Sequence, residues 1–480
     1  MTTSPGPAES WSSPLTERYA SAEMARIFSP QFKFETWRRL WLWLAEEEKR
    51  LGLPISDDAV SQMKAHLSDI DFTAAAREEE KMRHDVMAHV RTFGGAAPAA
   101  RGIIHWGATS AYVTDNADLI QMREGLSLVA RRLAAVLKRL RDFALAQRNV
   151  PALAYTHFQS AQPTTVGKRA TLWASDLLMD LGEVRRAGED LRFLGAKGAT
   201  GTQASFLSLF DGDGRKVEEL DAALARRAGF AKRQLVSGQT YSRKQDDRCL
   251  QALSGLAQSA HKMATDLRLL QHEGELEEPF ESGQVGSSAM PYKRNPMRAE
   301  RVCSLARHVI VLSMDTAFTA ASQWLERTLD DSANKRLAVP EAFLCADAIL
   351  ILLENIAGGL VVHADVSRRR LEAEAPFLAT ENVLMEAVRR GGDRQELHEA
   401  LRKHARASAD KRAADGAPAD LLDRLAADKV FGMTRPALAE AARPERLIGR
   451  AAEQVEIFVR EELDPALAGV EMAQSAAIRV

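Results

Sequence analysis

Apolar residues recur along the middle of the chain at steps that alternate between three and four positions. The longest such series runs through Leu119, Met122, Leu126, Val129, Leu133, Val136, Leu140 and Phe143. The same spacing returns over 250–267 and 302–312. Alternating steps of three and four place side chains on one stripe of an α-helix, so these segments predict long helices that pack in a bundle.

Further helices are predicted over 31–51, 71–94, 166–193 and 333–363. Helices of about 30 residues extend for about 45 Å, which implies an elongated bundle. After about residue 365 the pattern weakens into shorter pieces, which indicates a smaller helical unit. The sequence has no clear alternating strand pattern and no internal repeat. We therefore expect an all-α protein of three helical domains, at 1–111, 112–364 and 365–480.

Charge and composition exclude several classes of protein. The 480 residues are 46% hydrophobic and carry a net charge of −2, so nothing favours nucleic acid or an anionic membrane as a partner. The N-terminus lacks the apolar core of a signal peptide. The most apolar stretch, 348–362, contains Glu354 and Asn355 and is too short to span a bilayer. We expect a soluble, cytoplasmic protein in which this stretch is a buried helix.

The three cysteines, Cys249, Cys303 and Cys345, are far apart and odd in number. This spacing favours neither a disulfide framework nor a zinc site and fits a reducing compartment. His84, Asp85 and His89 do not share one face of a helix, so we do not expect a metal there.

Polar segments separate the predicted helices, at 105–116, 155–169, 195–206, 237–244 and 279–301. The glycines of 195–201 do not form a GxGxxG pattern, and we interpret them as chain turns between helices. The last segment contains GSSAMPYKRNPMRAER at 286–301. Ser287 follows no strand and lacks a GxSxG motif, which argues against a hydrolase. With Lys293 and Asn295 nearby, the segment is typical of a mobile lid that closes over an anionic substrate.

Two further positions stay open on the residues alone. His157 lies in a polar segment and is either a surface histidine or an acid or base near neutral pH. The segment 326–336 is either a solvated helix turn with an Arg327–Asp331 pair or a phosphate site at a helix N-terminus. Arg83 and His84 together could also hold an anion.

Longer motifs add a resemblance to a known family. GSSAMPYKRNP is similar to the signature GSSxMPxKxNP of the fumarase/aspartase superfamily of lyases. Within that superfamily the chain resembles the adenylosuccinate lyase family, in its longer animal form, from about residue 18 to about 460. The segments that carry this resemblance are RYAS (18–21), RHDVMAHV (83–90), GATSAYVTDN (107–116), THFQSAQPTTVGKR (156–169), KGATGTQASF (197–206), GQTYSRK (238–244) and ERTLDDSANKR (326–336).

The resemblance implies an all-α fold whose central bundles associate in a homotetramer and form a twenty-helix core. Each active site then draws loops from three subunits, and no metal or organic cofactor is expected. The implied reaction is β-elimination of fumarate from two nucleotides of purine biosynthesis. Adenylosuccinate gives AMP, and succinylaminoimidazole carboxamide ribotide gives aminoimidazole carboxamide ribotide.

Residue roles are also implied by the resemblance. Ser287 matches the general base and His157 the general acid, while Lys293 and Asn295 match the groups that hold a carboxylate. Thr109 and Ser110 match residues that bind a succinyl carboxylate. The matches to nucleotide and phosphate contacts are Arg18, Tyr19, Arg83, His84, Asp85, Gln239, Arg301, Arg327, Ser332 and Arg336, of which His84 also joins the catalytic set.

One position departs from the family pattern, because Ser160 stands where proline is frequent, which loosens the turn after His157. Two alternatives to the implied activity remain. A sister lyase acting on argininosuccinate, malate or aspartate would share the lid but not the phosphate contacts Arg18, Arg327, Ser332 and Arg336. A catalytically silent helical scaffold would not need the intact catalytic residues.

Overall fold

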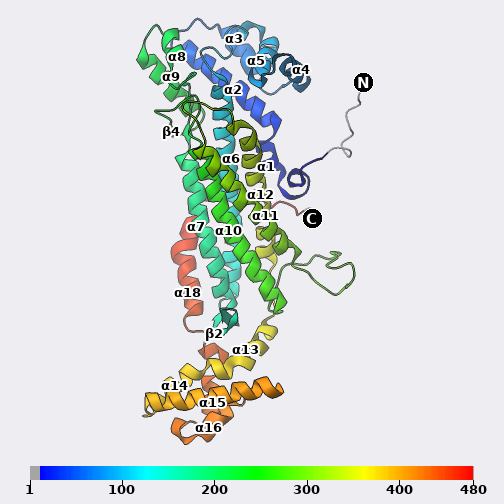
Figure 1. The fold of residues 1–480 in the computed structure, drawn as a ribbon, viewed down its shortest axis with the longest axis vertical. Coiled ribbons are helices and arrows are strands. Elements are labelled where there is room, and N and C mark those ends of the chain that lie inside the picture. Colours follow the sequence, from blue (N-terminus) through cyan, green and yellow to red (C-terminus); the bar gives the residue numbers. More distant parts are fainter. Residues whose placement is uncertain (1–10, 479–480) are drawn as a thin grey trace.

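The computed structural model describes residues 11–478, so most of the segment that bears on a signal peptide lies outside it. The molecule is a long upright bundle with smaller helical units at both ends (Figure 1). The bundle consists of α6 (Ser110–Ala146), α7 (Val166–Asp190), α10 (Lys244–His272), α11 (Met297–Ala321) and α12 (Asp331–Gly359). The expected all-α fold and its long bundle helices are confirmed.

The N-terminal part covers one end of this bundle. A π-helical turn (Leu15–Tyr19) precedes α1 (Ala22–Ile27), α2 (Pro30–Arg50), α3 (Asp57–Ala65), α4 (Phe72–Met82) and α5 (Asp85–Ala96). Two further helices, α8 (Ala204–Leu209) and α9 (Gly214–Arg227), lie at the same end. Ser29 caps α2 by accepting from the Phe32 N–H at 3.2 Å, and Pro30 occupies the first helical position, where no donor is needed.

The single helix predicted over 71–94 is wrong, because the chain breaks at Arg83. Asp71 caps α4 as expected, but Arg83 adopts a left-handed conformation with φ of 55°. His84 then caps α5, where its Nδ1 accepts from the Met87 N–H at 3.4 Å. Hydrophobic periodicity does not register such a break, because the apolar positions on both sides keep a helical spacing.

At the opposite end the chain forms a smaller unit with its own core. It contains α13 (Ala364–Leu378), α14 (Thr380–Arg389), α15 (Arg394–Asp415), α16 (Leu421–Ala427) and α17 (Arg435–Ala441). Buried residues from Ala379 to Ala442 pack together apart from the main core. The chain then returns along the bundle in α18 (Ala451–Phe458), a π-helical turn (Val459–Leu463) and α19 (Asp464–Leu467). The domain boundaries after residues 111 and 364 stay predictions.

Small sheets occur where the sequence predicted none. β1 (Pro151–Thr156) and β2 (Gln159–Thr165) form an antiparallel hairpin with an irregular register between Ala152 and Ala154. Its two turn residues, His157 and Phe158, both have positive φ, as tight hairpin turns require. Two shorter pairs complete the set: parallel β3 (Arg192–Phe193) with β4 (Lys232–Arg233), and antiparallel β5 (Leu276–Glu277) with β6 (Val361–Val362).

The apolar stretch 348–362 lies mostly in α12, where residues 348–353 are buried, so the expectation of a buried helix is confirmed. Over residues 11–478 no helix is both long enough and apolar enough to cross a membrane. α12 also packs closely on α6, since a Cβ on Gly125 would lie 2.7 Å from Cδ1 of Phe343. The three cysteines are free and buried.

One buried ion pair joins distant parts of the chain. Arg132 of α6 donates to Asp347 of α12, and neither side chain is more than 3% exposed. Asp347 also accepts the Ser21 backbone N–H at 2.6 Å, and Arg132 donates to the Gln474 carbonyl at 3.2 Å. This pair therefore fixes both terminal segments against the middle of the bundle.

Glu48 of α2 is fully buried, and neither of its carboxyl oxygens has a hydrogen-bond partner within residues 11–478. Burial raises the pKa of Glu48 to about 9, from an ordinary value of 4.5. The folded protein therefore retains a proton here that the unfolded chain releases above pH 4.5. Stability must fall as pH rises from about 5 to about 9, because deprotonation favours the unfolded state.

We expect Glu48→Gln to remove this part of the pH dependence. The stability difference between the variant and the native chain should grow by up to ~1.4 kcal/mol per pH unit across that range. Urea unfolding at fixed protein concentration measures it, with Glu453→Gln on the exposed surface of α18 as the control. Parallel pH profiles for the Glu48 variant and the native chain would show that this carboxyl does not titrate as stated.

Candidate active site

Eight of the sequence-predicted site residues line one cavity of about 490 Å³ near the N-terminal end of the bundle. They come from the α4–α5 break, the start of α6, the segment before α10 and the start of α12. These residues are Arg83, His84, Asp85, Ser110, Gln239, Arg327, Ser332 and Arg336. Thr109 precedes Ser110 as the cap residue of α6 but does not line the cavity.

The α4–α5 break orients the first of these side chains. While Nδ1 of His84 caps α5, its Nε2 lies 3.2 Å from the Ser110 hydroxyl. Asp85 accepts from the Val86 N–H at 2.7 Å and from Arg336 at 3.3 Å. The break therefore turns an imidazole and a carboxylate toward α6 and α12, which lie far away in sequence.

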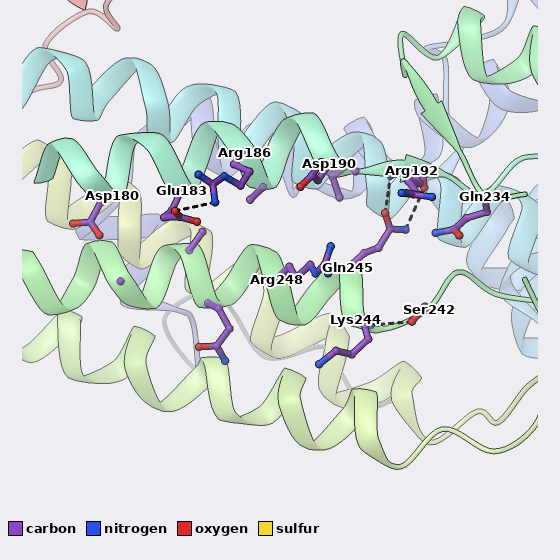
Figure 2. A pocket seen from close by; sticks show the side chains of 15 residues that line it. Asp180, Glu183, Arg186, Asp190, Arg192, Gln234, Ser242, Lys244, Gln245 and Arg248 are labelled. Carbon is purple, nitrogen blue, oxygen red and sulfur yellow. Dashed lines mark hydrogen bonds and ion pairs between the residues drawn. The ribbon is translucent and has the colours of Figure 1, made fainter. Parts of the chain in front are cut away.

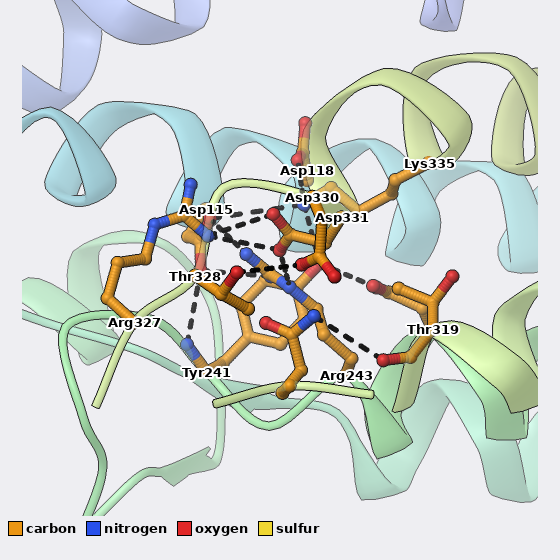
Figure 3. Close-up of polar contacts among 12 residues, drawn as sticks. Asp115, Asp118, Tyr241, Arg243, Thr319, Arg327, Thr328, Asp330, Asp331 and Lys335 are labelled. Atoms are coloured by element: carbon orange, nitrogen blue, oxygen red, sulfur yellow. Dashed lines mark hydrogen bonds and ion pairs between the residues drawn. The ribbon is translucent and has the colours of Figure 1, made fainter. Parts of the chain in front are cut away.

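A buried ionic network supports one wall of the cavity (Figure 3). Arg243 donates through both terminal nitrogens to Asp115, at 3.0 and 3.2 Å, and through Nε to Asp331 at 2.5 Å. Arg327 donates to the same Asp331 at 2.9 Å. The expected Arg327–Asp331 pair is present, but the Asp331 side chain is completely buried, so this pair is not solvated as a surface ion pair would be.

Lys335 extends this network toward Asp118, whose carboxylate lies 2.6 Å from its ammonium group. Burial alone would lower the pKa of Lys335, but Asp118 and Asp115 hold it above the ordinary value. Lys33 lies nearby, and its pKa is lowered by burial and by the neighbouring Arg336 and Lys335. The positive charge of Lys335 next to Arg336 favours an anionic ligand in this cavity.

The start of α12 adds to that preference. Arg327 and Arg336 flank its first turn, and Ser332 faces the cavity between them. Ser332 lies inside the helix and does not cap it, because Asp330 is the cap residue. Two guanidinium groups beside a helix N-terminus favour the phosphate-site interpretation of 326–336.

The sequence did not single out Lys33, Asp115, Asp118, Arg243 or Lys335 as functional. For Asp115 and Asp118 the sequence did contain a clue, because both are carboxylates near the start of the helix with the most regular apolar spacing. Charged residues on the buried side of a helix are rare unless they are paired. Periodicity alone could not name their partners, which lie more than a hundred residues away.

Three other predicted residues form a second group along the bundle. Arg18 and Tyr19 lie in the π-helical turn before α1. The guanidinium of Arg301, on α11, lies over the Tyr19 ring at 5.6 Å from its centroid. This arrangement brings together two segments that are more than 280 residues apart, although neither lines the 490 Å³ cavity.

Ser287, Lys293 and Asn295 lie in the segment 278–296, called the flap below, which projects sideways from the bundle before α11 (Figure 1). The Ser287 hydroxyl accepts from the Met290 N–H at 3.1 Å and the Ala289 N–H at 3.4 Å. Asn295 donates to the Gly286 carbonyl at 2.8 Å, while Lys293 is exposed. The flap therefore contains a serine whose hydroxyl oxygen already accepts hydrogen bonds from two backbone N–H groups.

Gly286 and Glu278 fix the base of the flap. A Cβ on Gly286 would lie 2.2 Å from the Lys293 carbonyl oxygen, so this close approach requires glycine. The Glu278 carboxylate accepts from the backbone N–H groups of Arg298 and Ala299, at 3.0 and 2.9 Å. These bonds satisfy the first donors of α11 and hold the end of the flap to the bundle.

His157 is exposed at the tip of the β1–β2 hairpin, near the C-terminal unit and at the opposite end of the bundle from the cavity (Figure 1). Gln162 of β2 donates to Glu381 of α14, which places the hairpin against that unit. A single chain therefore does not bring His157 and the 490 Å³ cavity together.

A further cavity of about 710 Å³ is a groove between α7 and α10 that contains none of the predicted residues (Figure 2). Charges of both signs line it, including Asp180, Glu183, Arg186 and Arg248. Glu183 and Arg186 lie 3.5 Å apart, a spacing typical of a surface ion pair. Within residues 11–478 no cluster of three or more His, Cys, Asp or Glu side chains could hold a metal ion.

Comparisons with known proteins match nearly the whole chain. The family described as "Lyase" matches residues 55–311, and the family described as "Adenylosuccinate lyase C-terminus" matches residues 376–458. Adenylosuccinate lyases of Schizosaccharomyces pombe and Saccharomyces cerevisiae are each 50% identical over 462 residues, 96% of both chains. That of Schistosoma mansoni is 49% identical over 461 residues, again covering 96% of both chains.

Solved structures share the fold. The 3-carboxy-cis,cis-muconate lactonizing enzyme of Pseudomonas putida has a TM-score of 0.82 at 23% identity. The match covers 94% of this chain and 99% of that one. A fumarate lyase of Mesorhizobium sp. BNC1 has a TM-score of 0.79 at 25% identity with the same coverage.

The long helical bundle, its flap and the family match together define a lyase of the fumarase/aspartase class. Sequence identity of 50% to two adenylosuccinate lyases, over 96% of this chain, identifies the family within that class. The chain belongs to the adenylosuccinate lyase family.

The shared anion Asp331 provides a test of the network. Asp331→Ala would remove the buried partner of Arg327 and one of the two buried carboxylates that bond to Arg243. Removing one partner from a buried ion pair typically costs about 3–5 kcal/mol of stability. Asp330→Ala is the matched control, because the neighbouring Asp330 is exposed and surface substitutions usually change stability by less than about 0.5 kcal/mol. Chemical unfolding measures both. Equal losses for the two variants would contradict the assigned role of Asp331.

Proposed function

We propose that this protein is an adenylosuccinate lyase that releases fumarate by β-elimination in purine nucleotide biosynthesis. Its substrates are adenylosuccinate, which gives AMP, and succinylaminoimidazole carboxamide ribotide, which gives aminoimidazole carboxamide ribotide. The observation that carries the proposal is the cavity in which Arg327, Ser332 and Arg336 face His84 and Ser110. Such a site offers guanidinium groups and a helix N-terminus for a phosphate, opposite hydroxyl and imidazole donors for the rest of the nucleotide.

In this reaction Ser287 acts as the general base and removes a proton beside a succinyl carboxylate. The electron pair of that C–H bond forms the new C=C bond, and the C–N bond breaks as His157 protonates the leaving nitrogen. The N–H groups of Ala289 and Met290 already point at the Ser287 oxygen, where they would stabilise an alkoxide. Exposed Lys293 supplies the positive charge that favours this ionised serine and the negative charge that builds on the carboxylate.

Other assigned residues position the substrate. Asn295 holds the Gly286 carbonyl through one N–H and has a second N–H for the carboxylate. Ser110 and Thr109, at the start of α6, bind the other end of the succinyl group. The remaining contacts to the nucleotide and its phosphate come from Arg18, Tyr19, Arg83, His84, Asp85, Gln239, Arg301, Arg327, Ser332 and Arg336.

The separation of these groups supports an active site shared between subunits of a homotetramer. The cavity, the Tyr19–Arg301 group, the flap and the hairpin lie at different heights along one bundle (Figure 1). An antiparallel or staggered neighbour would bring the flap and hairpin of other copies beside the cavity. Because the reaction needs only proton transfer and stabilisation of charge, we propose that it uses no metal or organic cofactor.

Exposed apolar side chains favour such an assembly. α11 exposes Val311, Met314 and Phe318, the last at 70%. The segment between α11 and α12 exposes Trp324 and Leu325, at 73% and 98%. Apolar surface of this extent is typical of subunit contacts. Three buried, free thiols also fit a reducing cytoplasm, where we propose that the protein acts.

The role of Ser287 can be tested against its neighbour Ser288. Ser287→Ala should lower kcat for fumarate release from adenylosuccinate by about 10²–10⁴-fold, the usual contribution of a general base, while substrate still binds. Ser288→Ala is the control and should stay within about tenfold of the native rate. Normal turnover by Ser287→Ala would remove it as the base. Argininosuccinate, malate and aspartate, assayed in parallel, should release no fumarate.

Subunit sharing predicts that two inactive variants complement each other. Ser287→Ala and His157→Ala homo-oligomers should both be inactive, because each lacks one group in every site. Unfolding and refolding them together should restore part of the activity, since some sites then receive an intact flap and an intact hairpin from different chains. Refolding each variant alone is the control. Absence of recovery in mixtures shown by mass spectrometry to contain both chains would contradict a shared site.

A further inference from the structure

Lys33, in the first turn of α2, lines the candidate active site, yet none of the roles proposed above involves it. Its side chain is half-buried, and its ammonium nitrogen lies 5.4 Å from the ring centroid of Phe34 and 5.0 Å from that of Trp37. Within residues 11–478 this nitrogen forms neither a hydrogen bond nor an ion pair. Aromatic faces attract a cation but do not neutralise its charge.

A ligand in the 490 Å³ cavity can reach this ammonium group. Lys33 lines the cavity together with Lys335 and Arg336, and its nitrogen is not one of the sealed side-chain atoms that lack a partner. The ring of Trp37 is completely buried, so the ammonium group lies between the apolar core and the cavity. The only open direction for a counter-ion is therefore the cavity itself.

The charged groups that act most strongly on Lys33 come from three helices. Asp85 lies on α5, Asp118 on α6, and Lys335 and Arg336 on α12. Both carboxylates already have another cation as a partner. Asp85 lies 3.3 Å from Arg336, and Asp118 lies 2.6 Å from Lys335. In this group of three cations and two carboxylates, Lys33 is the cation that has no counter-ion in the described part of the chain.

The position of Lys33 does not favour the stability of the fold. A positive charge in the first turn of a helix is repelled by the helix dipole. Burial and the neighbouring cations add to this cost, since they lower the pKa of Lys33 below its ordinary value. A bound anion beside the ammonium group would offset all three effects. The location therefore favours a role in ligand binding.

The candidate phosphate site lacks a cation of this kind. Its two guanidinium groups are each paired with a carboxylate, Arg327 with Asp331 at 2.9 Å and Arg336 with Asp85 at 3.3 Å. Paired guanidinium groups can donate hydrogen bonds but contribute little net charge. A phosphate monoester carries nearly two negative charges at neutral pH, so its site needs an additional cation.

We propose that Lys33 is a further phosphate-binding residue of the candidate active site and donates to the same phosphate group as Arg336. This inference rests on the proposed function, because the phosphate is that of the nucleotide substrate. The guanidinium groups fix the orientation of the phosphate, whereas Lys33 supplies the positive charge that Asp85 and Asp331 take away from them.

Isothermal titration of the full-length protein with inorganic phosphate at pH 8 tests this assignment. Lys33→Met should weaken phosphate binding by about 10–100-fold, the usual value of a hydrogen bond between charged groups. Lys33→Arg should restore the affinity to within about threefold of that of the native chain, because it retains a charged donor.

Lys216→Met is the matched control. Lys216 is likewise half-buried in the first turn of a helix, α9, and its ammonium nitrogen lies 5.8 Å from the ring centroid of Phe210. It does not line the 490 Å³ cavity, so this variant should bind phosphate as the native chain does.

The pH dependence of binding separates the charge of Lys33 from its volume. A bound anion raises the lowered pKa of Lys33 again, so phosphate affinity of the native chain should be highest below that pKa. It should fall as pH rises from 8 to 10, by at most about tenfold per pH unit. Lys33→Arg should bind equally well across this range, because its guanidinium stays protonated, and Lys33→Met should bind equally weakly.

Other titratable groups face Lys33 or the same cavity. Glu79, Arg83 and His84 line the cavity, while Tyr241 and Asp246 line a smaller cavity that Lys33 also borders. Carboxyl, imidazole and guanidinium groups ordinarily titrate outside pH 8–10. The pKa values of Tyr241 and Lys335 are raised above their ordinary values, which are about 10 and 10.5. A fall in affinity that Lys33→Met abolishes therefore belongs to Lys33.

Equal phosphate affinity in Lys33→Met and the native chain would overturn the proposal. So would a pH-dependent fall that persists in Lys33→Met, or no saturable phosphate binding to the native chain. Succinate, which carries only carboxylates, should bind both chains equally. Loss of succinate affinity alone would assign Lys33 to a carboxylate instead. A native chain that binds phosphate through Lys33 but releases no fumarate would contradict the proposed function and not the role of Lys33.

Discussion

A single buried guanidinium, that of Arg243, determines how the cavity end of the bundle is built. It lies between the carboxylates of Asp115 on α6 and Asp331 on α12 and bonds to both. Burial opposes its charge, but the two carboxylates raise the pKa of Arg243 well above the ordinary value. A buried ion of this kind is stable only when its partners are fully aligned. Three helix ends are therefore held in one relative position, and the cavity inherits its shape from them.

The same constraint explains why the candidate phosphate site lies where it does. Asp331 accepts from Arg243 on one oxygen and from Arg327 on both, so the second guanidinium is oriented by a residue four positions away. Arg336 lies one turn further along α12 and remains exposed toward the cavity. The buried Arg243–Asp331 pair is therefore rigid, whereas Arg327 and Arg336, which lie nearer the surface, are held less rigidly. That division suits a site that must hold a charged ligand and still release it.

The bundle was predictable from the sequence, because apolar residues spaced alternately three and four positions apart are a feature of any long buried helix. Its loops were less so. The break at Arg83 and the His157 hairpin both depend on residues with positive φ, which leave no trace in hydrophobic periodicity. Motif resemblance identified Arg327 and Arg336, but Asp115, Asp118 and Lys335 appeared only when tertiary contacts joined them. Local sequence cannot specify a pair whose members are separated by more than 200 residues.

The pairing of Arg132 with Asp347 has a consequence for synthesis of the chain. Their positions differ by 215 residues, so α6 leaves the ribosome long before the carboxylate that neutralises its buried arginine exists. At a translation rate of roughly 5–20 residues per second, that interval lasts on the order of ten to forty seconds. Throughout it the N-terminal half of the nascent chain cannot close its interior. Chaperone binding during translation would therefore be concentrated on the emerging α6, before α12 arrives.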